Sequence, residues 1–135
     1  MNIISMLGLL PSIKAIYKYK SVKNTVLLII GLINHYHNSN IEIYKIIDRL
    51  ICIYIGFYGS YYYKETRKFY CPIPFIFLIN YYLYKEKYSN KRMSNVIHVL
   101  FIQWPAIYAM YRECEIENIK NEKGLLKTRI IKFVL

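Results

Sequence analysis

The feature that most constrains this chain is a series of apolar blocks that lack a charged face. The block at 22–37 reads VKNTVLLIIGLINHYH and carries no charge from Thr25 to Ile33. The blocks at 70–84 and 96–111 contain no Lys, Arg, Asp or Glu at all. A helix of a soluble bundle needs one polar side that meets water. The pattern therefore disfavours a soluble helical bundle and predicts that lipid surrounds these segments.

Five such blocks predict an all-α fold, a multi-span transmembrane helical bundle of about five short helices. The expected spans are 2–19, 22–37, 46–63, 70–84 and 96–111. Together they make one domain, 1–111, followed by a charged tail, 112–135. Each block is shorter than the roughly 20 residues of a full span, so flanking Tyr, Lys and Arg side chains are expected to complete the crossing by snorkelling. Pro11 is expected to kink the first span.

Composition agrees with a lipid setting. Of the 135 residues, 56% are hydrophobic and only 20% are charged, which is more apolar than a soluble domain of this size needs. The mean hydropathy of +0.18 is modest because the chain contains 16 tyrosines, which hydropathy scales treat as polar. Tyrosine is enriched at membrane interfaces, where its ring lies among headgroups and its hydroxyl stays hydrated.

The net charge of +11 is distributed in short basic clusters between the apolar blocks. Basic clusters that bracket apolar segments are typical of contact with anionic lipid headgroups. Nucleic-acid binding is the less favoured interpretation, although basic clusters with interleaved tyrosines can also contact phosphates and bases. We expect the partners to be the lipid bilayer and its anionic headgroups, with no nucleic acid, and the bundle to be capable of forming a homo-oligomer.

The same clusters predict the orientation of an integral, multi-pass protein. With five spans, the loop after the first, the loop after the third and the C-terminal tail lie on one side and carry thirteen Lys and Arg residues. The other connections carry five. Because basic residues are retained on the cytoplasmic side, the N-terminus is predicted outside and the C-terminus in the cytoplasm.

The tail from Arg112 alternates in charge and ends in apolar residues. It is predicted to be an amphipathic helix on the cytoplasmic surface, broken or frayed at Gly124. The expected apolar stripe consists of Leu125, Leu126, Ile130, Ile131 and Phe133.

Four ionisable residues in or beside the predicted spans are candidates for a functional site: His35, His37, Asp48 and His98. The predicted topology places all of them near the outer boundary. Imidazoles and a carboxylate at one depth could hold Zn²⁺, with His37, His98 and His35 as candidate ligands and Asp48 as the candidate catalytic residue. The alternatives are ordinary: a boundary histidine is usually an interfacial polar group, and an acid beside Arg49 at the start of a helix favours the helix dipole.

The order of these residues resembles the superfamily of alkaline ceramidases and of progestin and adipoQ receptors. The resemblance rests on GLINHYHN, then Asp48, then NVIHVLFIQW. It implies an intramembrane zinc hydrolase in which His37 or His35 and His98 bind zinc, and Asp48 orients or deprotonates a water molecule. The pattern is degenerate, because Ile33 or Gly31 stands where the family has a serine, Ile102 stands where it has a second histidine, and two spans are lacking.

Three functional hypotheses follow. The first is a non-enzymatic membrane protein with a structural, scaffold or membrane-remodelling role, and the second is the zinc-dependent amide or lipid hydrolase or a decayed descendant of one. The third is a small channel or carrier, although no polar stripe runs through a whole span. In composition the chain also resembles uncharacterised membrane proteins of large DNA viruses of amoebae.

Overall fold

The computed structural model describes the backbone of residues 1–38 and 40–134, and side chains up to residue 125 except at position 39. The prediction of an all-α fold is confirmed, because this part of the chain is helical and contains no strand. In chain order the elements are α1 (Ile3–Leu9), α2 (Ser12–Tyr19), α3 (Val22–Tyr36), α4 (Glu42–Tyr62), α5 (Arg67–Tyr70), α6 (Ile73–Lys85), α7 (Lys91–His98), the π-helix η1 (Val99–Gln103) and α8 (Trp104–Val134).

The first predicted segment contains two helices. Asn2 caps α1 by accepting a hydrogen bond from the Ser5 N–H. The chain leaves the helix at Leu10 and Pro11, as expected because proline lacks the N–H that would continue the ladder. Helix α2 ends at Lys20, whose φ of 53° is left-handed, and the Ser21 hydroxyl then caps α3. The kink predicted at Pro11 is therefore observed as a break.

Helix α4 begins earlier than its apolar block. It starts at Glu42, which occupies the first turn and favours the helix dipole. Asp48 and Arg49 consequently lie in the second turn, where the sequence had indicated the first. The start is earlier because a polar segment continues a helix readily once a favourable N-terminal acid is present.

The last apolar block lies within one continuous helical rod formed by α7, η1 and α8. The ring of Pro105 cannot donate to the carbonyl of Phe101 and would press on it in a regular α-helix. The wider π-turn just before it, in which the Trp104 N–H donates to the Val99 carbonyl, relieves this conflict. Helix α8 then continues through residue 111 and through Gly124 to Val134, so the break predicted at Gly124 is absent from the described helix. Apart from Leu125, the predicted apolar stripe lies outside the described side chains.

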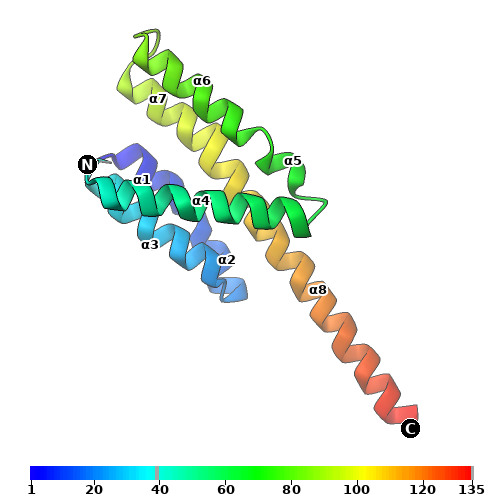
Figure 1. Cartoon of the computed structure of the whole chain (residues 1–135). Helices are drawn as coiled ribbons and strands as arrows, with labels where there is room; N and C mark the ends of the chain where they lie inside the picture. Colours follow the sequence, from blue (N-terminus) through cyan, green and yellow to red (C-terminus); the bar gives the residue numbers. More distant parts are fainter. Residues whose placement is uncertain (39, 135) are drawn as a thin grey trace.

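The helices gather so that the chain connections meet at two ends. Asn2, the turn after α3 and the α6–α7 loop lie at one end, which we call the amide end because Asn2, Asn38, Asn40 and Asn95 line a pocket there. The α2–α3 turn, the end of α4 and the middle of α8 meet at the other, which we call the basic end. Beyond it α8 continues away from the bundle to Val134 (Figure 1).

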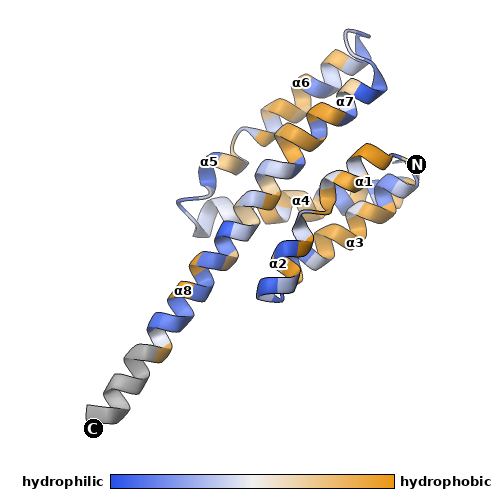
Figure 2. Ribbon diagram, turned by 180° about the vertical axis from the view of Figure 1, so that it is seen from behind, coloured by the Kyte–Doolittle hydropathy of each residue, from blue (hydrophilic) through white to orange (hydrophobic). Residues whose placement is uncertain are grey.

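An apolar layer separates the two ends. It consists of Leu9, Leu27, Ile55, Ile107 and Met110, which are buried together. Figure 2 shows that apolar residues dominate α1, α3 and α6, whereas α8 becomes polar after it leaves the bundle. Within the described residues, no helix combines the length and the apolarity that crossing a membrane requires.

Candidate functional site

Three of the four predicted site residues belong to a polar cluster near the amide end. The ring centroids of His35 and His98 lie 5.7 Å apart, and the Nε2 atoms of His35 and Gln103 lie 3.4 Å apart. The Asn34 amide donates to Asp48 Oδ2 at 2.8 Å. We call these five residues, Asn34, His35, Asp48, His98 and Gln103, the His35 cluster. The cluster connects α3, α4, α7 and η1. Gln103 belongs to the π-turn and is buried beside His35 near the end of α3.

His37 lies outside this cluster. Its ring contacts Tyr36 and Tyr44, with centroids 5.2 and 5.5 Å away. The described residues contain no group of three His, Cys, Asp or Glu side chains that could hold a metal ion. The arrangement thus does not fit a three-ligand zinc centre, and the zinc assignment of His35, His37 and His98 stays a prediction from sequence.

Several polar atoms of the His35 cluster are buried without a hydrogen-bond partner among the described residues: Asn34 Oδ1, His35 Nδ1 and Gln103 Oε1. If Gln103 donates to His35 Nε2, the proton of the neutral ring lies on Nδ1, where it has no acceptor. Burying a polar group without a partner costs about 1–3 kcal/mol. This cluster is therefore only partly stabilised by its own contacts.

A second polar cluster lies at the basic end and is centred on Glu113. This carboxylate is only 1% exposed. It pairs with Lys23 at 3.2 Å and accepts hydrogen bonds from the hydroxyls of Tyr70 at 2.7 Å and Thr66 at 3.2 Å. These four residues, the Glu113 cluster, join α3, α5, α8 and the α4–α5 connection. A buried carboxylate is tolerated when it is both paired and hydrogen-bonded, as it is here.

Glycine in α4 makes room for this carboxylate. A Cβ added to Gly59 would collide with Glu113 and with the Tyr70 ring, whereas one added to Gly56, three residues earlier, would meet nothing within 4 Å. Gly8 packs in the same way against Gln103 and Val99, and Gly31 packs against Leu9. Helix contacts through glycine bring backbones close together, a mode of packing common between membrane helices.

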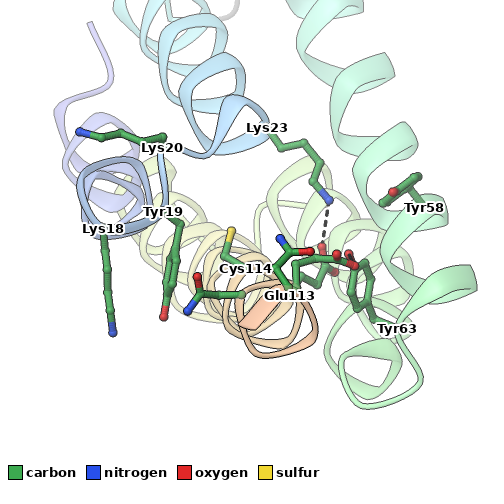
Figure 3. Close-up of a pocket in the computed structure, with 11 residues that line it drawn as sticks. Lys18, Tyr19, Lys20, Lys23, Tyr58, Tyr63, Glu113 and Cys114 are labelled. Carbon is green, nitrogen blue, oxygen red and sulfur yellow. Dashed lines mark hydrogen bonds and ion pairs between the residues drawn. The ribbon is translucent and has the colours of Figure 1, made fainter. Parts of the chain in front are cut away.

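A pocket of about 540 Å³ opens beside the Glu113 cluster, between the α2–α3 turn, the end of α4 and α8. Figure 3 shows Lys23 reaching inward to Glu113, while the amines of Lys18 and Lys20 extend away from it at the rim. The Lys23 amine also lies 4.4 Å from the centroid of the Tyr58 ring. Cys114 lines the pocket too, and burial raises the pKa of its thiol. The thiol is therefore protonated and weakly nucleophilic at neutral pH.

The sequence analysis did not identify the Glu113 cluster. Glu113 lies in a tail segment in which charges alternate, and such segments are usually solvated. The available signal was its position three residues after the apolar Met110, on the face that continues toward the core. Comparison of the chain with models of protein families, with curated proteins and with solved structures finds no match to any of them.

Proposed function

We propose that this chain is a multi-pass integral membrane protein with a structural role, a scaffold that holds α8 rigidly at the cytoplasmic face. The observation that carries the proposal is an inverted distribution of side chains. Phe57, Tyr61 and Phe75 are at least 70% exposed, whereas Asn24 and Glu113 are at most 1% exposed. Polar groups that face the inside of a bundle, with large apolar groups outside, are typical of helices in lipid.

The arrangement of the connections supports the orientation. The α2–α3 turn, the α4–α5 connection and α8 carry the larger share of basic residues, and they meet at the basic end. The amide end gathers the connections that are poorer in Lys and Arg. Under the positive-inside rule, the basic end faces the cytoplasm. Helices α3 and α6, with 15 and 13 residues, are short for a span, and we infer that local thinning of the bilayer and the flanking tyrosines accommodate them.

The scaffold role follows from α8. Ala109 and Met110 are buried within the bundle, Glu113 fixes the next turn, and the Tyr63 hydroxyl donates to Glu117 at 2.6 Å one turn later. The exposed, charged continuation of α8 then leaves the bundle in a direction set by these contacts (Figure 1). Such a rod can present a binding surface at a defined angle to the membrane.

Extraction of membranes at alkaline pH tests the membrane assignment. The full chain is expected to stay in the membrane pellet in sodium carbonate, whereas a peripheral protein held by charge would be released by high salt or carbonate. Release into the supernatant would refute the proposal.

Cysteine labelling tests the orientation. In a background with Cys52, Cys71 and Cys114 changed to Ala, Glu86→Cys marks the amide end and Lys64→Cys marks the basic end, and both positions are exposed. A membrane-impermeant maleimide is expected to label Glu86→Cys in intact cells and Lys64→Cys only after permeabilisation. The reverse pattern would overturn the orientation.

Spin labels test the rigidity of α8. In the same background, labels at Lys64→Cys and Glu122→Cys are expected to give a narrow distance distribution, which broadens when Glu113 is changed to Ala. A broad distribution in the otherwise unchanged chain would refute the scaffold role.

The second candidate function is the zinc hydrolase, and the proximity of His35 to His98 is the observation that favours it. Metal analysis of detergent-purified protein is the test. Zinc in the unaltered chain that is lost on changing His35 and His98 to Ala would support this alternative, and a zinc-free protein would eliminate it.

A further inference from the structure

We infer that the pocket at the basic end binds the phosphate of an anionic phospholipid headgroup from the cytoplasmic leaflet. The inference rests on the proposed membrane setting and names a specific ligand for one site within it. A volume of about 540 Å³ lies in the range of small-ligand pockets, and the pocket lies at the end that would face the inner leaflet.

The carboxylates of the pocket already have partners. Glu113 is paired with Lys23 and accepts from two hydroxyls, and Glu117 accepts from Tyr63. Lys23 neutralises the charge of Glu113, whereas the neutral Tyr63 hydroxyl leaves the charge of Glu117 in place. With three lysines and two glutamates, the lining of the pocket still carries a net positive charge. The lysines at the rim, Lys18 and Lys20, contact tyrosines rather than acids: the Lys18 amine lies 3.4 Å from the Tyr111 hydroxyl, and that of Lys20 lies 5.9 Å from the centroid of the Tyr17 ring. Figure 3 shows both amines directed away from Glu113, and neither has an acidic partner among the described residues, so both are available to an anion at the rim.

The backbone adds to this positive potential. Helix α3 begins at Val22, between the pocket residues Lys20 and Lys23, so the positive end of its dipole lies near the pocket. The first turn of α3 contains Lys23 and no acid that would offset the dipole. Lys20 ends α2 in a left-handed conformation, and Figure 3 shows its side chain at the rim.

The surroundings suit the rest of a lipid molecule. Asn118 and Asn121 line the pocket from α8 and can bond the polar substituent of a headgroup. An apolar stripe, Val22, Val26, Ile29 and Ile33, begins beside Lys23 and follows the exposed side of α3. Residues spaced in this way share one helix face, so the stripe offers a path for an acyl chain that leaves the pocket toward the middle of the bilayer.

Native mass spectrometry of the full chain in detergent tests the inference, with phosphatidylglycerol and phosphatidylcholine of identical acyl chains as probes. The variant is Lys18→Gln with Lys20→Gln, and the matched control is Lys85→Gln with Lys87→Gln at the end of α6. Both pairs lie at a helix end and include one left-handed lysine, Lys20 with φ 53° and Lys87 with φ 60°. A second variant, Asn121→Phe, fills the pocket without changing the charge.

The unaltered chain is expected to retain phosphatidylglycerol in preference to phosphatidylcholine, with one molecule bound. The rim variant should weaken this binding about 30-fold, since each lysine near an anionic surface contributes about fivefold, and the control pair should leave it nearly unchanged. Asn121→Phe should also weaken it.

Equal losses for the two lysine pairs, or no effect of Asn121→Phe, would overturn the inference by showing that charge alone attracts the lipid. Displacement of the lipid by millimolar inorganic phosphate would overturn the lipid as the source of the anion. The failure of the proposed function is seen separately, as release in carbonate. A chain that resists carbonate but shows no lipid preference would refute only the headgroup site.

Discussion

The His35 cluster and the Glu113 cluster are both buried and polar, yet their hydrogen bonding differs. The Glu113 carboxylate accepts hydrogen bonds from three donors on three different segments: an amine, a phenol and an aliphatic hydroxyl. In the His35 cluster, atoms of Asn34, His35 and Gln103 lack partners among the described residues. The difference teaches that a buried charge with all of its hydrogen bonds made holds helices together firmly. A polar cluster with unpaired atoms contributes little to the contact between helices.

The comparison predicts that Glu113 is the polar residue on which stability depends most. Glu113→Ala removes the common partner of Lys23, Thr66 and Tyr70, and we expect a loss of about 3–5 kcal/mol in the free energy of unfolding. Reversible unfolding in mixed detergent measures this loss. The control is Glu115→Ala, which removes an ion pair with Arg112 nearer the surface. A loss below about 1 kcal/mol for Glu113→Ala would show that the Glu113 cluster does not hold the helices together.

The close packing over Gly59 gives the next largest effect. Gly59→Ala is expected to cost about 2–3 kcal/mol, because the new methyl group meets the carboxylate of Glu113 and the rigid ring of Tyr70. Gly56→Ala, on the same helix but facing open space, should be neutral or stabilise by up to about 1 kcal/mol through helix propensity. Equal effects of the two substitutions would contradict the packing described here.

Substitution of two tyrosines at the basic end compares a buried hydrogen bond with one nearer the surface. Tyr70→Phe leaves the buried carboxylate with one donor fewer and should cost about 1.5–3 kcal/mol, as expected for a bond to a charged group. Tyr63→Phe removes a bond to the exposed Glu117 and should cost less than about 1 kcal/mol. The same unfolding measurement applies. A larger loss for Tyr63→Phe than for Tyr70→Phe would contradict the conclusion that the bond to buried Glu113 is the stronger one.

The smallest effect is expected in the His35 cluster. Gln103→Met keeps the length of the side chain and removes both an oxygen without a partner among the described residues and the 3.4 Å contact with His35 Nε2. Because relief of the buried oxygen offsets the loss of this long contact, the free energy of unfolding should change by no more than about 1 kcal/mol. His35→Leu serves as a second substitution in the same cluster. If Gln103→Met destabilises the chain as much as Glu113→Ala does, the two clusters are equivalent and the comparison fails.

Much of the fold could be predicted from the sequence. The positions of α3, α4 and α6 follow from apolar blocks, and the break before α2 follows from Pro11. The start of α4 at Glu42 and the continuity of α8 through Gly124 could not be predicted in the same way, because polar segments fit a helix or a loop equally well until their neighbours are known. The π-turn also depends on context, since a proline can kink, break or widen a helix.

The candidate site was predicted only in part. Histidines and an aspartate in apolar blocks are rare enough to be noticed, and His35, Asp48 and His98 do lie in neighbouring parts of the bundle. His37 is two residues from His35, and the helical rotation between them directs its ring to Tyr44 on another side. Glu113, in contrast, is one charge in a charged tail, and it is buried because α8 continues the face of Met110 and places the carboxylate against Gly59 of α4.

The sequence by itself determined that the chain is helical, that several of its apolar blocks lack charged residues, and that its basic residues are concentrated in alternate connections. These properties depend on local composition and period, which each segment carries independently. Only the tertiary structure decided which polar residues have partners and where the basic connections form a pocket. Burial and hydrogen bonding are properties of pairs of residues far apart in the chain, such as Lys23 and Glu113, and no single segment encodes them.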